Sequence, residues 1–367
     1  MNLFIHRVDR VKRALRRRRL DAILITEPHN RRYLSGYTVS DHGIEESSGA
    51  LLIPKSGKPY LLTDSRFLLQ AEEEAQGFIV ELYQRDLITL VVKMLPDLGI
   101  QRLGFESHYF LHDAAQRLED RAQAAGIDPV PMTGLIEAMR RVKDEHELEL
   151  LRQSTRLNEQ VFHSVYSSIE PGMTERQIAL ALELTMREMG AECPSFATIV
   201  AFGTNAAKPH AVPSERILDP DELVLIDMGL VLQGYCSDMT RTFVAGNPDT
   251  TYVKRHRLVR AAQQAAIKVI RAGVTCREVD RAARRVIEED GYGQYFSHSL
   301  GHGVGLAVHE APRLNTRSRQ KLKPGMVVTV EPGIYQQQWG GIRLENMVVV
   351  REDGCELLNQ DTTFLDL

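Results

Sequence analysis

The sequence predicts an α+β protein of two domains. A smaller α/β domain is expected over residues 1–142, and a larger domain of two related α/β halves over residues 143–367. Three observations support this prediction. A chain of 367 residues has the length of roughly two domains. Residues 144–169 form a mostly charged stretch without Gly or Pro, which is typical of a long helix. The part of the chain that follows contains a faint internal repeat.

The composition excludes several classes of protein. Lys and Arg number 45 and Asp and Glu 49, and the net charge of −4 argues against binding nucleic acid through bulk charge. No apolar run approaches the ~20 residues of a membrane helix, and the short apolar start is not typical of a secretory signal. The four cysteines form no Cys-x-x-Cys pair, so we expect a reduced, cytoplasmic location. Neither nucleic acid nor membrane is expected as a partner.

Short helices and strands alternate in the first domain. Apolar residues recur at helical spacing over residues 8–15, and the other faces of that helix are strongly basic. We interpret these basic faces as solvated rather than as a nucleic-acid patch. Residues 21–26 predict a buried strand. Residues 49–54 and 59–63 flank a turn sequence, which predicts a hairpin.

The repeat organises the second domain. Near the start of residues 171–190 and of residues 272–291, a Thr is followed three residues later by Gln or Glu. This is the capping-box pattern of a helix start, with Thr174 and Thr275 as the capping residues. A histidine, an acid that ends an apolar strand and an acid on a later strand follow in both halves. These matched pairs are His210 and His309, Asp227 and Glu331, and Asp238 and Glu345. We expect two halves related by a pseudo-two-fold axis, with the paired residues in one central cleft.

The first pair of acids lies on a predicted hairpin. A turn centred between Leu232 and Gln233 would place Asp227 directly opposite Asp238, with Cβ atoms ~5 Å apart. Because residues 223–226 predict a buried strand, these carboxylates need a proton or a cation between them. The alternative is a solvent-facing hairpin in which the two acids simply repel.

The second half supplies three more candidates. His302 lies in a glycine-rich segment that allows close approach of a ligand, without the Lys-Ser/Thr of a phosphate loop. Glu331 ends an apolar strand, and Glu345 is expected to share a strand face with Arg343 and Met347 over residues 341–350. Four carboxylates would balance the charge of two divalent cations while the imidazole stays neutral. The oxygen-rich set favours Mn²⁺, with Co²⁺ or Zn²⁺ as alternatives, and two such ions can activate a bridging water for hydrolysis.

These residues, in this order, resemble the metallopeptidase family of methionine aminopeptidase, Xaa-Pro aminopeptidase (aminopeptidase P) and prolidase, whose catalytic domain has the "pita-bread" fold. The resemblance covers residues 145–367 through the matching strings Asp227 with Asp238, residues 297–305, residues 308–312, residues 331–333 and residues 343–346. Residues 31–37 and 60–66 resemble the first domain of prolidases and aminopeptidase P, which methionine aminopeptidases lack. Creatinase shares the two-domain layout but lacks the metal ligands.

The resemblance implies a role for each residue. The implied metal ligands are Asp227, Asp238, His302, Glu331 and Glu345, with Asp238 and Glu345 bridging the two metals. Glu331 is also implied to take the proton of the bridging water, and His210 and His309 to steady the scissile peptide and the tetrahedral intermediate. His298 would line the pocket for the proline ring. Arg313 and Arg343 are implied either to orient Glu345 or to bind a substrate carboxylate.

The leading hypothesis is therefore a dinuclear metal-dependent exopeptidase that cleaves the bond between an N-terminal residue and proline. Its substrate would be a peptide or a dipeptide with proline in second position, and the resemblance implies a homodimer. Two alternatives stay open: a non-catalytic peptide-binding module on the same fold, and a different amidohydrolase on the same metal site. The sequence does not separate a dipeptidase from an aminopeptidase.

Overall fold

The computed structural model describes residues 3–367, which divide into a unit ending at Met139 and a unit spanning Arg140–Leu367. Each unit has a hydrophobic core of its own. The expected domain boundary at residue 142 lies close to this division and stays a prediction. Within residues 3–367, no helix is both long and apolar enough to span a bilayer.

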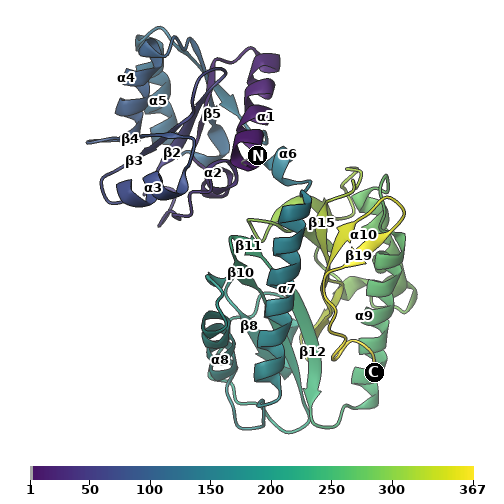
Figure 1. Cartoon of the computed structure of the whole chain (residues 1–367). Coiled ribbons are helices and arrows are strands. Elements are labelled where there is room, and N and C mark those ends of the chain that lie inside the picture. The colour runs from purple at the N-terminus through teal and green to yellow at the C-terminus, as the bar shows by residue number, and fades with distance from the viewer. Residues whose placement is uncertain (1–2) are drawn as a thin grey trace. The chain divides into compact units, whose positions relative to one another are not determined.

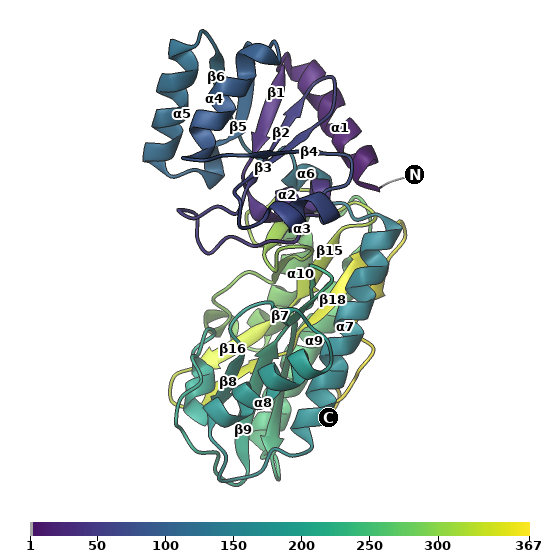
Figure 2. The same ribbon diagram turned by 60° about the vertical axis from the view of Figure 1, so that its left-hand side comes forward.

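The first unit is a mixed six-stranded sheet with helices on both sides. The strand order is β4-β3-β2-β1-β5-β6, and the predicted hairpin of β2 and β3 is antiparallel. Helix α1 lies on one side of the strands, and α4 and α5 lie on the other (Figure 2). The strands are β1 (Ala22–Ile25), β2 (Ala50–Pro54), β3 (Tyr60–Thr63), β4 (Ile79–Leu82), β5 (Arg102–Glu106) and β6 (Asp128–Met132). The α-helices up to the end of this unit are α1 (Leu3–Arg18), α2 (Pro28–Ser35), α3 (Leu68–Glu74), α4 (Leu87–Asp97), α5 (His112–Ala124) and α6 (Glu137–Arg140).

The second unit contains both halves of the repeat. Its helices are α7 (Glu145–Tyr166), α8 (Glu175–Glu188), α9 (Thr250–Val269) and α10 (Cys276–Glu289). The strands of the first half are β7 (Cys193–Pro194), β8 (Ile199–Phe202), β9 (Glu222–Met228), β10 (Leu230–Leu232), β11 (Tyr235–Cys236) and β12 (Met239–Ala245). Those of the second half are β13 (Gly301–Gly303), β14 (Glu310–Leu314), β15 (Val327–Val330), β16 (Gly333–Gln336), β17 (Gly340–Arg343), β18 (Asn346–Val350) and β19 (Cys355–Leu357). Figure 1 shows α8 and α9 on opposite flanks of these strands.

The repeat predicted from the sequence is present in the hydrogen bonds. Both predicted capping boxes form, and each capping Thr pairs with a residue of a later loop: Thr174 with Ile217, and Thr275 with Lys321. The residue after each capping Thr also bonds the same loop. In the first half, the N–H of Glu175 donates to a carbonyl oxygen of that loop at 3.1 Å. The N–H of Cys276 does the same in the second half at 2.9 Å. The two halves therefore start their second helix in the same way.

Strand β9 separates two cores. Val224 and Ile226 belong to the core under α7 and α8, whereas Leu225 belongs to the core under α9 and α10. Successive side chains of a strand point to opposite faces, so a strand buried on both sides needs the continuous apolar run seen here. The alternation places Asp227 on the same face as Leu225.

Candidate metal centre

The first two acids lie on the hairpin of β9 and β12. The hairpin forms as predicted, but its register differs, because Asp227 pairs with Thr240 and not with Asp238. The turn is formed by Gln233 and Gly234, both with positive φ (49° and 84°). Glycine adopts such a φ without strain, which favours this turn over one centred a residue earlier. Asp238 therefore lies diagonally across from Asp227, and the prediction that the two face each other directly was wrong.

The other two acids follow strands of the second half. Glu331 comes directly after β15, as predicted. The prediction of one continuous strand over residues 341–350 was wrong: β17 ends at Arg343 and pairs with β16, whereas β18 pairs with β15. Glu345 lies in the break between β17 and β18. Its main chain is therefore held by something other than those strand pairings.

One cavity of about 550 Å³ in the second unit is lined by every residue that the sequence singled out. These residues are Asp227, Asp238, Glu331, Glu345, His210, His298, His302, His309, Arg313 and Arg343. The sequence analysis missed the apolar part of the lining, which includes Phe196, Ile199 and Val212. Such scattered apolar residues carry no motif, so only the folded chain identifies them.

The His302 imidazole directs the lone pair of one ring nitrogen toward the acids. Its Nδ1 lies 3.1 Å from the carbonyl oxygen of Gly303, and a carbonyl only accepts, so Nδ1 carries the hydrogen. Burial, and next the neighbouring His309, lower the pKa of His302 to about 4, so the ring is neutral at pH 7. The unprotonated Nε2 then lies 3.5 Å from Asp238 Oδ2 and 3.3 Å from Glu331 Oε1. Three electron-rich atoms this close are favourable only with a proton or a cation between them.

The buried acids repel one another. Burial first, and then the charges of Glu345 and Asp227, raise the pKa of Asp238 well above its usual range. Burial and the charge of Glu331 likewise raise the pKa of Glu345. Burial also raises the pKa of Glu331 to about 8. Ligand atoms of Asp238, His302 and Glu345 all lie within 4.8 Å of one another. A divalent cation at this point would remove the repulsion, so the donor set fits one.

Asp227 also presents an open coordination position. Its Oδ2 accepts a hydrogen bond from Arg343 Nη2 at 2.5 Å, whereas its buried Oδ1 has no hydrogen-bond partner among residues 3–367. A buried carboxylate oxygen left unpaired is costly unless a cation fills the gap. The resemblance implied that Arg343 orients Glu345 or binds a substrate carboxylate. In the structure, the carboxylate that Arg343 bonds is that of Asp227.

A chain of hydrogen bonds leads from Arg343 to the predicted proline pocket. Arg343 Nη1 donates to the hydroxyl of Tyr335 at 2.7 Å, and that hydroxyl lies 2.9 Å from His298 Nε2. Nδ1 of His298 bonds the carbonyl of Ser299, so Nε2 accepts from Tyr335. Burial, and next Arg343, lower the pKa of His298 to about 4. The sequence analysis missed Tyr335, and nothing in its spacing relates it to His298.

The other two histidines lie at the same cavity. The rings of His302 and His309 meet edge to face with centroids 4.4 Å apart, and burial lowers the pKa of His309. His210 and the exposed Arg313 also line the cavity. His210 and His309, the histidines that the repeat matched, therefore line the same cavity as the four acids.

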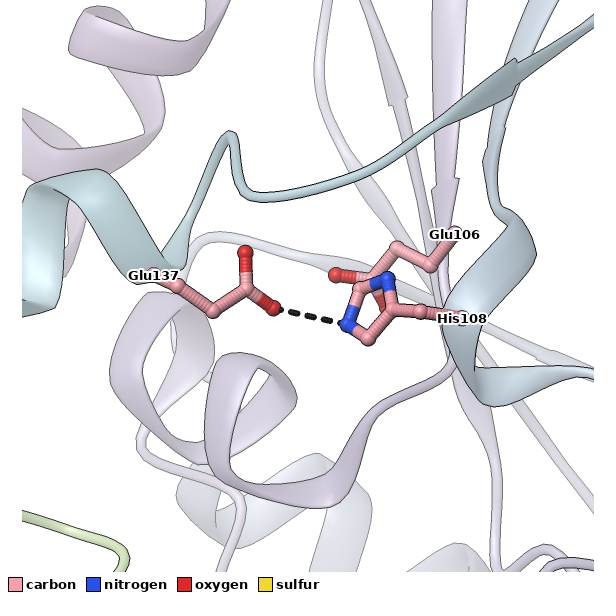
Figure 3. Close-up of side chains that lie close together, drawn as sticks. All are labelled: Glu106, His108 and Glu137. Atoms are coloured by element: carbon pink, nitrogen blue, oxygen red, sulfur yellow. Dashed lines mark ion pairs between the residues drawn. The ribbon is translucent and has the colours of Figure 1, made fainter. Parts of the chain in front are cut away.

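A second cluster of acids and a histidine, in the first unit, is organised differently. Glu137 lies 2.9 Å from His108 Nε2, next to Glu106 (Figure 3). The amide of Asn30 donates to both glutamates, at 2.6 and 2.7 Å. The other oxygen of Glu106 accepts two main-chain N–H groups, from Thr26 at 2.7 Å and its neighbour at 2.8 Å. These donors bond both oxygens of Glu106, although burial still raises its pKa to about 8, and the three side chains form a group that could also hold a cation.

Known protein families match the chain over nearly its whole length. The family model "Metallopeptidase family M24" matches residues 149–352, and "Creatinase/Prolidase N-terminal domain" matches residues 7–142. An Xaa-Pro dipeptidase of Pyrococcus furiosus is 32% identical over 354 residues, which are 96% of this chain and 97% of the relative.

Two solved structures are similar over nearly the full length. An Xaa-Pro dipeptidase from Bacillus anthracis has a TM-score of 0.91 at 36% identity, covering 98% of both chains. An X-Pro aminopeptidase from Thermotoga maritima has a TM-score of 0.86 at 36% identity, covering 95% of this chain and 98% of its own. The pita-bread fold expected for the second domain is thereby confirmed. The chain belongs to metallopeptidase family M24, with a creatinase/prolidase-type domain ahead of the peptidase domain.

Proposed function

We propose that the protein is a dinuclear metal-dependent exopeptidase that hydrolyses the bond between an N-terminal residue and proline. The observation that carries the proposal is the neutral His302, whose Nε2 lies within 3.5 Å of two buried carboxylates in a cavity lined by two more. Family M24 is a family of metallopeptidases, and the relatives described above are named for Xaa-Pro substrates.

The proposed metal ligands are Asp227, Asp238, His302, Glu331 and Glu345. Their four negative charges match two divalent cations, whereas a single cation, even with the guanidinium of Arg343 on Asp227, would leave one carboxylate uncompensated in a buried site. Mn²⁺ is the ion that we favour for this oxygen-rich set. When bound, the two ions would supply a nucleophilic water and polarise the scissile carbonyl.

Side chains around the acids would manage protons and the substrate. Glu331, whose carboxylate lies 3.3 Å from His302 Nε2 at the metal centre, is the proposed proton carrier. His309 and His210 would donate hydrogen bonds to the carbonyl oxygen on which negative charge develops.

The proline ring would lie against His298, which Tyr335 holds in place. An Xaa-Pro bond lacks the amide N–H that most peptidases bind when they dock a substrate as a strand. A ring pocket and a clamp on the free amino terminus avoid that requirement. Arg313, exposed at the same cavity, would bind the carboxylate of a dipeptide.

Release of alanine from Ala-Pro and from Ala-Pro-Ala, measured with Mn²⁺ after chelator treatment, tests the proposal. Cleavage of the dipeptide alone indicates a dipeptidase, and cleavage of the tripeptide indicates an aminopeptidase. In a dipeptidase, Arg313→Met should raise KM for Ala-Pro with little change in kcat. If neither peptide is cut while two metals bind, the Xaa-Pro assignment is wrong and another amide is the substrate.

We also propose that the protein is a homodimer, as the family resemblance implies, and that it is cytoplasmic, as its cysteine pattern led us to expect. Size-exclusion chromatography with light scattering gives the mass in solution directly. A mass equal to one chain at micromolar concentration would contradict the dimer.

A further inference from the structure

Glu345 has an unusual main-chain environment. It lies in the break between β17 and β18, outside the pairings that those strands make with β16 and β15. The hairpin of the other half supplies its partners instead. The N–H of Glu345 donates to the carbonyl of Thr240 at 3.1 Å, and its own carbonyl accepts from Arg241 Nη1 at 2.7 Å. Its carboxylate accepts from the hydroxyl of Thr240 at 2.7 Å.

Arg241 is a fully buried cation, with 0% of its surface exposed. Each acceptor recorded for its guanidinium is a main-chain carbonyl: Thr240 at 3.0 Å, Glu345 at 2.7 Å and Asp361 at 3.0 Å. Burial lowers the pKa of Arg241 to about 10, so it remains charged at pH 7. The charges of Asp361, Glu159 and Glu345 also stabilise the buried cation. An apolar residue could fill the same volume without these partners, so the arginine is explained by the carbonyls that it binds.

The third carbonyl belongs to a segment that is itself anchored. The N–H of Asp361 donates to Glu159 of α7 at 2.9 Å, and Asp361 Oδ1 lies 3.1 Å from Nε2 of His163 on the same helix. Arg241 therefore links three parts of the second unit: the hairpin that carries Asp227 and Asp238, the break that carries Glu345, and a C-terminal segment fixed to α7.

We propose that Arg241 is a positioning residue for the metal centre. It holds the main chain of Glu345 and thereby aims the Glu345 carboxylate at Asp238 and His302. Arg241 does not belong to the lining of the cavity, so it acts through Glu345 and touches neither metal nor substrate. The inference rests on the proposed function in one respect, the assignment of Glu345 as a metal ligand.

Two variants separate position from charge. Arg241→Met removes the charge and every donor at similar length, and Arg241→Lys keeps the charge but replaces the planar fork by a single amino group. Neither can bond the Glu345 and Asp361 carbonyls together as the guanidinium does. The matched control is Arg285→Met on α10, whose exposed guanidinium pairs with the exposed Glu289. Thermal unfolding of each metal-free variant shows whether it is folded.

The first readout is the dissociation constant of Mn²⁺, measured by calorimetry on metal-free protein. We expect both Arg241 variants to weaken binding by about 10- to 100-fold, the usual effect of losing a group that orients a metal ligand. Arg285→Met should bind as the unaltered protein does. If Arg241→Lys binds normally and only Arg241→Met is weakened, the charge matters and the positioning role is wrong. If Arg241→Met does not fold, the comparison rests on Arg241→Lys.

The second readout is hydrogen exchange of the peptide that contains Glu345, in metal-free protein. Exchange should be faster in both Arg241 variants and unchanged in Arg285→Met. This measurement separates the two proposals, because it needs no metal. Unaltered protein that binds no Mn²⁺ would contradict the proposed function. Normal exchange and normal Mn²⁺ affinity in Arg241→Lys would contradict only the role of Arg241.

Discussion

At the scale of single residues, the metal centre is a set of groups that are unfavourable when left alone. Asp238 lies among three other carboxylates, one oxygen of Asp227 is buried without a partner, and the lone pair of His302 points at two acids. Each of these features raises the free energy of the metal-free fold. Each becomes favourable when divalent cations occupy the gap between the ligand atoms.

Asp238→Asn should therefore separate stability from metal binding. Removal of one of four mutually repelling charges should leave the metal-free protein as stable as before, or more stable. The rise in melting temperature on adding Mn²⁺, and the peptidase activity, should both fall strongly. Thermal unfolding with and without Mn²⁺ and metal analysis measure these effects. Full activity in a well-folded, metal-poor variant would contradict the mechanism.

At the scale of elements, two loops bring the ligands together, and each depends on one contact. The loop between His302 and His309 is closed by Glu310, whose carboxylate accepts the N–H of Ala307 at 3.1 Å. Glu310 is buried and bonds Arg140 at 2.6 Å and Lys143 at 3.4 Å. Burial alone would raise the pKa of Glu310, but Lys143 and Arg140 lower it to about 2.

Glu310→Gln should destabilise the protein by about 3 kcal/mol at pH 7, because it removes the negative charge that both buried cations bind. The folded pKa of about 2 lies below the ordinary value of 4.5, so this stabilisation is complete above pH 4.5 and is lost as the pH falls toward 2. Urea unfolding of both proteins between pH 7 and pH 3 should show the difference shrinking below pH 4.5. Glu215→Gln, in an exposed pair with Arg176, is the control and should show no such gap.

The second contact lies at Gly229, between Asp227 and Asp238. A Cβ atom at this position would lie 2.1 Å from the carbonyl oxygen of Ser237, the residue before Asp238. Gly229→Ala should therefore displace Asp238 and weaken Mn²⁺ binding by at least tenfold, with a loss of stability of about 1–3 kcal/mol. Calorimetry and urea unfolding measure the two effects. Gly354→Ala is the control, since its Cβ would meet nothing within 4 Å, and equal behaviour of the two variants would argue against this role.

At the scale of the whole molecule, the second unit is completed by residues at its very start. Arg140 opens this unit and bonds Glu310, beside the candidate catalytic His309. The boundary expected from the sequence, between residues 142 and 143, would remove Arg140 from the catalytic part. The position of the cut therefore has a measurable consequence.

A fragment of residues 143–367 should melt below a fragment of residues 140–367. If the bond from Arg140 contributes about 2 kcal/mol, the difference in melting temperature is about 4–8 °C. Differential scanning calorimetry of the two fragments measures it. Equal melting temperatures would show that Arg140 contributes nothing to this unit on its own.

The sequence by itself determined the elements and the chemistry. The capping boxes at Thr174 and Thr275 are local patterns of four residues, so they predict helix starts without any knowledge of the fold. The repeat then identified four acids and two histidines, His210 and His309, that line one cavity. These features are readable because the same local rules act in both halves.

Only the tertiary structure decided how the groups meet. A hairpin can shift its register by a small change of turn, and Gly234 as the second turn residue was the one signal for the observed pairing. The break before Glu345 was not predicted. The hydrogen bonds from Arg343 to Asp227 and from Arg241 to Glu345 join residues about 100 positions apart. Such pairings depend on the packing of whole halves against each other, which no local pattern encodes.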